Sequence, residues 1–460
     1  MTRRDMLQTS GLGFGAIAAS WLGADAHGAV VQPHTQARAK AVIMLMQNGG
    51  PGQMDLFDPK PDLDKFDGRV HGEQVEMFQK GSEANKLLRS PFEFAPHGQS
   101  GMELSEVIPG IASVADELCL VRSMVSEHNN HTEGLVLMNT GKIFQGRPAL
   151  GSWISYGLGS ENDNLPAYVV LRDPAGYNTS GTLLWQNGWL PAKHRGTEIN
   201  TQGTPVWNLD PPPDLDPAAR KDDLRFLAQL NRHHHRRHAD YSELEARIEN
   251  YELAARMQLE AADLLNLDHE SEATRQLYGL DIETTKSYGL RCLMARRLVE
   301  AGVRFVQIFP PLKPQFQPWD AHTDTKKENE TICAQCDLPS AALITDLRQR
   351  GLLDETLVLW TGEFGRLPVS QNKSGRDHNR NAFSLFMAGA GMKRGHIHGS
   401  TDQVGYRVAD GKLTVPDLHA TILERLGLDH NRLTFDHNGG PETLTDSRLT
   451  GARIATELFA

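Results

Sequence analysis

The chain has 460 residues, of which 23% are charged and 39% hydrophobic, and its formal net charge at pH 7 is −11. This composition is ordinary for a globular protein, and the acidic balance gives no general attraction to nucleic acid or to an anionic membrane. Four cysteines are too few for a disulfide framework in a chain of this length. Length and composition together allow one large α/β domain or two ordinary ones.

The first residues have the features of an export signal. Arg3 and Arg4 precede an apolar stretch over residues 11–22, and Ala24–Ala26 offers a small-x-small cleavage site. This order is typical of a secretory signal, and the paired arginines indicate the twin-arginine export machinery as a partner. The apolar stretch is shorter than the roughly 20 residues that cross a bilayer. We expect a signal peptide over residues 1–26 and a periplasmic or extracellular mature chain without a stable membrane span; a retained N-terminal anchor is the alternative.

Six short apolar runs predict buried strands, and helical patterns lie between them. Such alternation is typical of a mainly parallel sheet with helices on both faces. The predicted strands cover residues 39–46, 118–121, 167–171, 303–309, 357–360 and 383–388. The predicted helices cover residues 108–116, 131–140, 242–263, 284–300, 338–350 and 415–426. We therefore predict one doubly wound α/β domain over residues 39–460, with a surface excursion around residues 184–230.

Polar residues that bind metals and anions follow several predicted strands, where ligand sites of such sheets lie. Asn48 follows the first strand beside two glycines, which let a backbone approach a ligand closely. Asp320 and His322 stand two apart, so in extended chain they project to one side, and both residue types bind zinc. The structural alternatives are a tight turn at Asn48 and a simple Asp–His hydrogen bond in a loop.

Two more segments have the same character. His131 and Thr132 open a predicted helix, whose free N–H groups favour an anion, unless the segment is only a helix cap. A denser cluster follows the strand at 357–360, and its two arginines suit a bidentate grip on an oxyanion. The alternative for that cluster is a structural network of salt bridges. Its members are Glu363, Arg366, Arg376, Asp377 and His378.

Two motifs look like metal or redox sites and are interpreted otherwise. The histidines at 233–235 are flanked by arginines that would repel a cation, so we expect a solvated helix face. Cys333 and Cys336 have the spacing of a redox or zinc half-site, but no second pair stands at zinc-finger spacing. They fit one face of a helix, with a disulfide between them as the alternative.

Long segments of the chain, from about residue 39 to 458, resemble a known family, domain of unknown function 1501 (DUF1501). The family is sulfatase-like and related to the alkaline phosphatase superfamily. The resemblance implies an alkaline phosphatase-like fold, with metal ions at the carboxyl ends of the strands. The matching segments are GGPGQMDLFDPKP (Gly49–Pro61), GRPALGSWISYGLGSENDNLPAYVVL (Gly146–Leu171), CLMARRLVEAGVRFVQ (Cys292–Gln307), RGLLDETLVLWTGEFGR (Arg350–Arg366) and DLHATILERLGLDHNRLTF (Asp417–Phe435).

The resemblance carries over only in part. Asp320, His322 and His378 look like one metal set of the superfamily. Asn48 and Glu363 stand where the second set has aspartates, and Phe364 replaces a histidine ligand of that set. His131 stands nine residues before a Thr-Gly pair, where sulfatases carry a cysteine or serine nucleophile.

These observations predict an exported metal-dependent hydrolase of sulfate or phosphate esters, holding one or two ions of zinc, calcium or magnesium. Its substrate would be a small anionic ester or a carbohydrate. The attacking group would be His131, Thr132 or a water activated by the metal, with Arg366 and Arg376 as the other catalytic residues. The alternatives are a binding protein without hydrolytic activity and a different metal-assisted reaction. The predicted ligands are Asn48, Asp320, His322, Glu363, Asp377 and His378.

Overall fold

The computed structural model describes residues 33–202, 262–312 and 316–460, together with short helical stretches between residues 222 and 257. The predicted signal peptide and most of the helix predicted at 242–263 lie outside these ranges and stay predictions. No helix of the described residues is long and apolar enough to cross a membrane.

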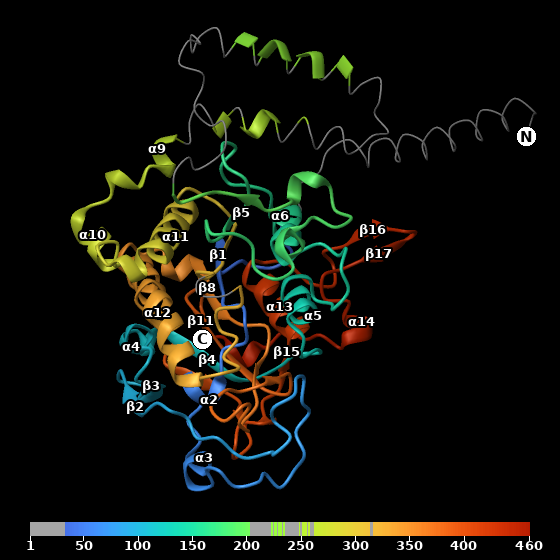
Figure 1. The fold of residues 1–460 in the computed structure, drawn as a ribbon. Coiled ribbons are helices and arrows are strands. Elements are labelled where there is room, and N and C mark those ends of the chain that lie inside the picture. The colour runs from blue at the N-terminus through green and yellow to red at the C-terminus, as the bar shows by residue number, and fades with distance from the viewer. Residues whose placement is uncertain are drawn as a thin grey trace, which may run out of the picture. The chain divides into compact units, whose positions relative to one another are not determined.

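A mixed, mainly parallel sheet forms the centre of the fold (Figure 1). One strand runs against its two neighbours, and every other pair in the sheet is parallel. In order across the sheet the strands are β12 (His396–His398), β4 (Leu118–Val125), the antiparallel β11 (Phe383–Ala388), β8 (Thr356–Thr361), β1 (Ala41–Met46), β7 (Phe305–Ile308), β5 (Tyr168–Leu171) and β6 (Thr197–Glu198), with β15 (Leu413–Thr414) beside β4.

All six predicted strands are found in this sheet, as β1, β4, β5, β7, β8 and β11, so the predicted α/β class is confirmed. Helices cover both of its faces (Figure 1). On one face lie α4 (Pro109–Ser113), α11 (Glu283–Glu300) and α12 (Thr325–Gln349), and on the other lie α5 (His131–Thr140), α6 (Leu150–Leu158) and α13 (Val415–Arg425).

Strand β1 shows why an unbroken apolar run takes this central place. Ile43 and Leu45 pack into the core under α11 and α12, whereas Val42 and Met44 pack into the core under α5 and α13. Successive strand residues point to opposite faces, so a strand covered on both sides needs apolar residues at every position. Each of these four side chains is at most 1% exposed.

Helix α12 is longer than its sequence pattern predicted. It begins at Thr325 rather than near residue 338, because the Asp324 side chain accepts a hydrogen bond from the Lys327 N–H and caps the helix. Pro339, which looks like a helix start in the sequence, lies inside the helix. Cys333 and Cys336 are both buried, free thiols on α12, as the helix-face interpretation expects.

The first part of the predicted surface excursion does not stay on the surface. Leu184, Trp185 and Ile199 are buried, and β6 pairs with β5 at the edge of the sheet. Because this segment is rich in Pro, Gly and Asn, its sequence did not predict that these three apolar side chains would be buried. Most of the later part of the excursion lies outside the described residues.

Smaller elements complete the described fold. The two-stranded antiparallel sheets are β2 (Phe94–His97) with β3 (Met102–Ser105), β9 (Gly365–Arg366) with β10 (His378–Asn379), β13 (Ser400–Thr401) with β14 (Val408–Asp410), and β16 (Phe435–His437) with β17 (Gly440–Glu442). The short helices are α2 (Gln53–Leu56), α3 (Pro61–Lys65), α9 (Ala262–Leu265), α10 (Glu272–Leu277) and α14 (Ser447–Thr450).

The strand directions bring distant segments to one edge. β1, β4, β7 and β8 run the same way, so the segments that follow them leave the sheet at the same edge. β11 runs the opposite way, so the segment that precedes it reaches this edge too. The polar residues singled out in the sequence therefore meet at the carboxyl ends of the parallel strands, where sites of such sheets lie.

Candidate metal centre

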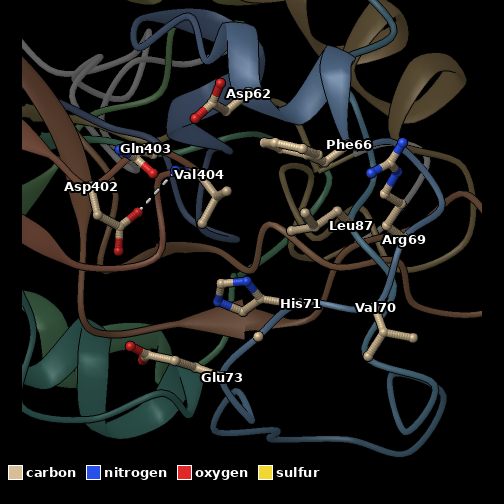
Figure 2. A pocket seen from close by; sticks show the side chains of 11 residues that line it. Asp62, Phe66, Arg69, Val70, His71, Glu73, Leu87, Asp402, Gln403 and Val404 are labelled. Atoms are coloured by element: carbon tan, nitrogen blue, oxygen red, sulfur yellow. Dashed lines mark hydrogen bonds between the residues drawn. The ribbon is translucent and has the colours of Figure 1, made fainter.

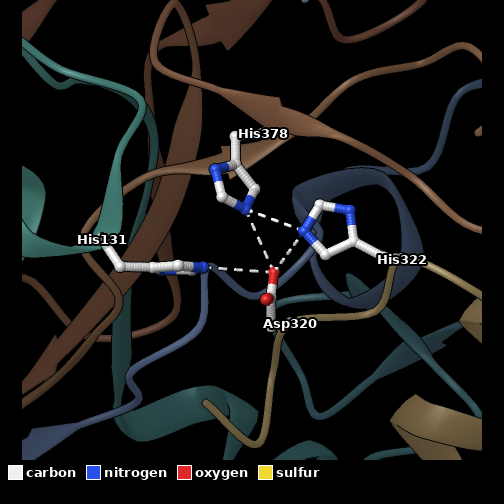
Figure 3. A group of neighbouring side chains, drawn as sticks. All are labelled: His131, Asp320, His322 and His378. Carbon is white, nitrogen blue, oxygen red and sulfur yellow. Dashed lines mark hydrogen bonds and ion pairs between the residues drawn. The ribbon is translucent and has the colours of Figure 1, made fainter. Parts of the chain in front are cut away.

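Four side chains converge on one point at this edge (Figure 3). The Oδ1 atom of Asp320 lies 2.8 Å from His322 Nε2, 3.1 Å from His378 Nε2 and 3.2 Å from His131 Nε2. The Nε2 atoms of His322 and His378 are 3.0 Å apart. Of the described residues, only these four form a group of His, Cys, Asp or Glu with metal-ligand spacing.

These four residues come from three separate segments of the chain. Asp320 and His322 belong to the segment between β7 and α12, His378 lies on β10, and His131 is the first residue of α5. Gly49 lets the loop after β1 pack against the first of these segments. Its φ is 121°, and a Cβ there would lie 2.6 Å from the Trp319 nitrogen. The glycine thus serves a backbone–backbone contact beside Asp320.

Each histidine uses its Nδ1 atom away from the centre. His378 Nδ1 lies 2.6 Å from the carbonyl oxygen of Asn129, and His131 Nδ1 lies 2.6 Å from Glu363 Oε1. His322 Nδ1 contacts Gln371 Oε1, whose amide nitrogen donates to the Lys80 carbonyl. All three partners are acceptors, so Nδ1 carries a proton in each ring, and the Nε2 atom of a neutral ring presents a lone pair toward Asp320; a metal ion would take the place of any proton that His131 Nε2 holds. Outer hydrogen bonds of this kind orient the histidine ligands of metal ions.

The electrostatics of the cluster favour a positive charge at its centre. Burial works against the charge on Asp320, but the Arg366 guanidinium and the three imidazoles hold its pKa well below the usual range. Burial also opposes charge on His131, yet its contacts with Asp320 and Glu363 raise its pKa to about 9. For His378, burial dominates and lowers the pKa to about 3. The surroundings thus supply negative charge and lone pairs that a cation would satisfy.

This donor set fits a divalent metal ion. Zinc binds imidazole nitrogen and carboxylate oxygen at close to 2 Å, which puts neighbouring ligand atoms about 3.3 Å apart in a tetrahedral site. Four of the six distances between the ligand atoms, from 2.8 to 3.2 Å, are near this value, and all six are within 4.8 Å. His131 Nε2 is buried, and its contact there is the ion pair with Asp320 Oδ1 at 3.2 Å. Side-chain exposures of 20% for Asp320 and 16% for His322 leave the cluster open to solvent on one side.

The other predicted ligands do not join this group. Glu363 is buried and accepts hydrogen bonds from the Gly49 N–H and from His131 Nδ1. Asn48 turns its amide nitrogen to Gln317 Oε1 at 2.6 Å. Phe364 is buried and packs its ring 5.0 Å from that of His131 and 4.6 Å from that of His378. Glu363 and Phe364 are thus engaged in contacts within the protein, whereas Asn48 Oδ1 is buried and has no hydrogen-bond partner among the described residues.

Asp377, a predicted ligand, has a different task. Its Oδ2 accepts the N–H groups of Phe78 at 2.7 Å and Gln79 at 2.8 Å, and its Oδ1 accepts the N–H of His378. These bonds anchor residues 70–79, here called the strap. At the end of the strap the ring of Phe78 stacks on that of His378, with ring centres 4.7 Å apart. The carboxylate is engaged with backbone and is not a ligand of the centre.

Neither predicted arginine offers a free guanidinium to a substrate, which corrects the proposed grip on an oxyanion. Arg376 is fully buried and forms a bidentate ion pair with Asp55, at 2.8 and 3.0 Å. Arg366 is buried as well, and its Nη2 lies 2.6 Å from Asp320 Oδ1. Its remaining donors go to carbonyl oxygens, those of Gly49, Gly50, Trp319 and Arg376.

The predicted nucleophile His131 lies among the candidate ligands, with both ring nitrogens engaged in the contacts above. Thr132 is half-buried in the first turn of α5, next to the centre in sequence. Sequence reasoning missed Gln371, the outer partner of His322, and the stacked Phe78. Asp55 and Asn129 belong to polar segments that the sequence singles out, but their roles depend on contacts with Arg376 and His378 that only the structure shows.

The predicted histidine tract does not supply a second site in the described part of the chain. His233 and His234 are exposed, and neither belongs to a group with metal-ligand spacing. The third histidine of the tract, His235, lies outside the described residues.

Several solved structures match the chain over much of its length, with TM-scores below 0.5. A phosphonate monoester hydrolase from Silicibacter pomeroyi has a TM-score of 0.35 and 11% identity, covering 91% of this chain and 78% of its own. A sulfatase from Pseudoalteromonas sp. has a TM-score of 0.36 and 14% identity, covering 85% of this chain and 68% of its own. The C-terminal periplasmic domain of EcEptC from Escherichia coli, in complex with zinc, has a TM-score of 0.40 and 9% identity, covering 92% and 98%.

Sequence comparison gives the family directly. No curated protein matches the chain. The family described as "Protein of unknown function (DUF1501)" matches residues 39–457, which is almost the whole described chain. The chain belongs to this family.

Proposed function

We propose that the chain is a metal-dependent hydrolase of sulfate or phosphate esters that acts outside the cytoplasm. One observation carries the proposal: three imidazole Nε2 atoms converge on a carboxylate oxygen, while the Nδ1 of each ring is held by an acceptor. Lone pairs and negative charge gathered in a partly buried site are stabilised by a cation. The convergence of three loops on one point supports a site over incidental pairing.

The chain's own residues would position both ion and substrate. Asp320 and the three histidines would hold the ion, and a divalent cation supplies Lewis acidity toward an ester oxygen. Arg366 holds the Asp320 carboxylate in place. Helix α5 begins at His131, so the positive end of its dipole lies beside the centre and favours an anionic group. With both nitrogens of His131 engaged, the attacking group is water or the Thr132 hydroxyl.

Metal content and turnover test the proposal together. We expect the full chain to bind a divalent ion and, when loaded, to hydrolyse 4-nitrophenyl sulfate or 4-nitrophenyl phosphate. His322→Ala and His378→Ala should each lose bound metal and activity. The exposed His234 provides the control, since His234→Ala should retain both. Equal metal content in all three variants, or a loaded protein that hydrolyses neither ester, contradicts the proposal.

A second candidate is a binding protein that does not hydrolyse its ligand. Two observations favour it. The side chains of Arg366, Arg376 and Glu363 are all bound to other protein groups, so none is free for a substrate. The phenyl ring of Phe364 stands where the superfamily resemblance implies a histidine ligand. Metal-loaded protein that binds anions or saccharides without turning over an ester would select this candidate.

Export is tested separately. The proposed location outside the cytoplasm rests on Arg3, Arg4 and the short apolar stretch after them. Replacing both arginines by lysine should leave the precursor in the cytoplasm of an expressing bacterium, as cell fractionation would detect. Normal export of this double variant would refute the twin-arginine route.

A further inference from the structure

A pocket of about 390 Å³ lies outside the metal centre, between α3, the start of the strap and the loop around Val404 (Figure 2). Its volume is within the range of about 300–1,000 Å³ typical of small-molecule sites. Its apolar surface comes from Phe66, Leu87 and Val404, which surround the hollow together with His71. The pocket is thus open to solvent and has the phenyl ring of Phe66 in its wall.

Four polar side chains at this pocket make no hydrogen bond or ion pair with the described part of the chain, although Arg69 lies over the Phe66 ring and His71 packs edge-on against Tyr406. Within the described residues, Asp62, Arg69, His71 and Gln403 make no side-chain hydrogen bond or ion pair, although all four line the pocket. Polar groups of this kind are the ones that orient a ligand in an otherwise apolar pocket. They include a carboxylate that accepts, a guanidinium that donates, and an amide and an imidazole that do both.

The lining carries three carboxylates, those of Asp62, Glu73 and Asp402, and one guanidinium, that of Arg69. Glu73 pairs with Arg407 at 3.2 Å, and the Asp402 carboxylate accepts the N–H groups of residues 404, 406 and 407. The pocket is therefore net negative, which disfavours an anionic ligand, and its carboxylates can accept hydrogen bonds from hydroxyl groups. A neutral ligand with hydroxyl groups and an apolar face matches it, and this is the chemistry of a sugar ring.

Two connections join the pocket to the metal centre. The carbonyl oxygen of Tyr406 accepts from Asn379 Nδ2 at 2.9 Å, and Asn379 follows the candidate ligand His378. The Tyr406 hydroxyl accepts from the Glu76 N–H at 2.9 Å, within the strap. The strap lines the pocket at its start and stacks Phe78 on His378 at its end. One continuous segment thus borders both sites.

We infer that this pocket binds a neutral sugar unit, and that it holds the saccharide part of an ester whose charged group lies at the metal centre. The second half of this inference rests on the proposed function, because it needs an ester to react at the centre. Sugar binding itself does not depend on turnover. A half-buried aromatic ring, that of Phe66, and adaptable hydrogen-bonding groups recognise such a ligand at low cost in side-chain entropy.

Calorimetric titration of the full, zinc-loaded chain with neutral hexaoses tests the inference. The probes are cellohexaose, xylohexaose, laminarihexaose and mannohexaose. We expect at least one to bind, and expect Phe66→Ala and Gln403→Ala to weaken its Kd about tenfold or more, as loss of a central contact does. Gln403 is exposed, so its replacement should leave folding intact. The matched control is Phe144→Ala, which removes a phenyl ring that is 68% exposed and not part of the pocket.

The possible outcomes distinguish sugar binding at the pocket from ester hydrolysis at the metal centre. Binding that is lost in the pocket variants and kept in Phe144→Ala supports the inference, even when no ester is hydrolysed and the proposed function fails. Absence of binding for all four hexaoses overturns it. Binding that survives both pocket substitutions also overturns it, because the sugar then occupies another site.

Discussion

The Glu363 carboxylate lies 2.6 Å from His131 Nδ1 and accepts the Gly49 N–H with both of its oxygens. Glu363 stands at a position where resemblance to the alkaline phosphatase superfamily implied a metal ligand. In the structure it instead orients an imidazole whose other nitrogen points to Asp320. A carboxylate behind a histidine fixes the ring orientation and raises its basicity as a ligand.

This relationship predicts different effects for two substitutions of one residue. Glu363→Ala removes the acceptor for the His131 Nδ1–H and should weaken metal affinity by about 10–100-fold. Glu363→Gln retains an acceptor oxygen and should restore most of the affinity. Competition with a chromogenic chelator measures both. The exposed Glu355 provides a control, because Glu355→Gln should have no effect. A Glu363→Ala variant with wild-type metal affinity would contradict the prediction that Glu363 orients His131.

Asp377 should control the strap rather than the metal. Asp377→Ala removes the acceptor for the N–H groups of Phe78 and Gln79, so the strap should open while the bound ion stays. Hydrogen–deuterium exchange of residues 74–82 should rise in this variant, and metal content should change little. Loss of the metal with unchanged exchange would instead return Asp377 to the list of ligands.

Arg376 should matter for stability. Breaking a buried ion pair leaves the partner charge unpaired, and such losses cost about 3–5 kcal/mol. Arg376→Ala leaves Asp55 uncompensated, and we expect urea denaturation to show a fall of this size in the free energy of unfolding. The exposed pair of Arg453 and Glu457 is the control, since Arg453→Ala should cost about 1 kcal/mol or less. A stable Arg376→Ala protein without activity would support a catalytic arginine.

Two buried histidines outside the metal centre, His194 and His419, should make the stability of the fold sensitive to acid. Burial lowers the pKa of His194 to about 3 and that of His419 to about 4. An unfolded histidine titrates near 6.5, so between these values the unfolded chain binds more protons than the folded chain. The contribution of these neutral histidines to the free energy of unfolding is therefore complete above about pH 6.5. It is lost as pH falls through each folded-state pKa, by about 3 kcal/mol for His419 alone.

Urea unfolding between pH 7 and pH 4 measures this effect. His419→Gln should flatten the dependence over this range, whereas the exposed His234→Gln should not. A pH dependence that is unchanged in His419→Gln would show that other groups cause the acid sensitivity.

The sequence predicted the sheet better than the site, for physical reasons. Strands such as β1 and β8 are buried on both faces, so an unbroken apolar run in the sequence is enough to predict them. Asp320, His322 and His378 belong to residue types that bind metals and stand after strands, so their convergence could be expected. The partner of Arg376 could not, because Asp55 lies on α2, far from Arg376 in the chain. A metal-ligand role for His131 was one of the alternatives that the sequence offered, but its contact with Glu363 could not be predicted, because the two residues are 232 positions apart in the chain.

X-ray absorption spectroscopy of the zinc-loaded chain tests the central claim most directly. We expect one tightly bound ion per chain, with the scattering pattern of three imidazole rings and one oxygen donor at about 2.0 Å. His378→Ala should lose one imidazole from that pattern or lose the ion. A protein that holds no ion, or an ion with only oxygen neighbours, would contradict a metal centre built from Asp320, His131, His322 and His378.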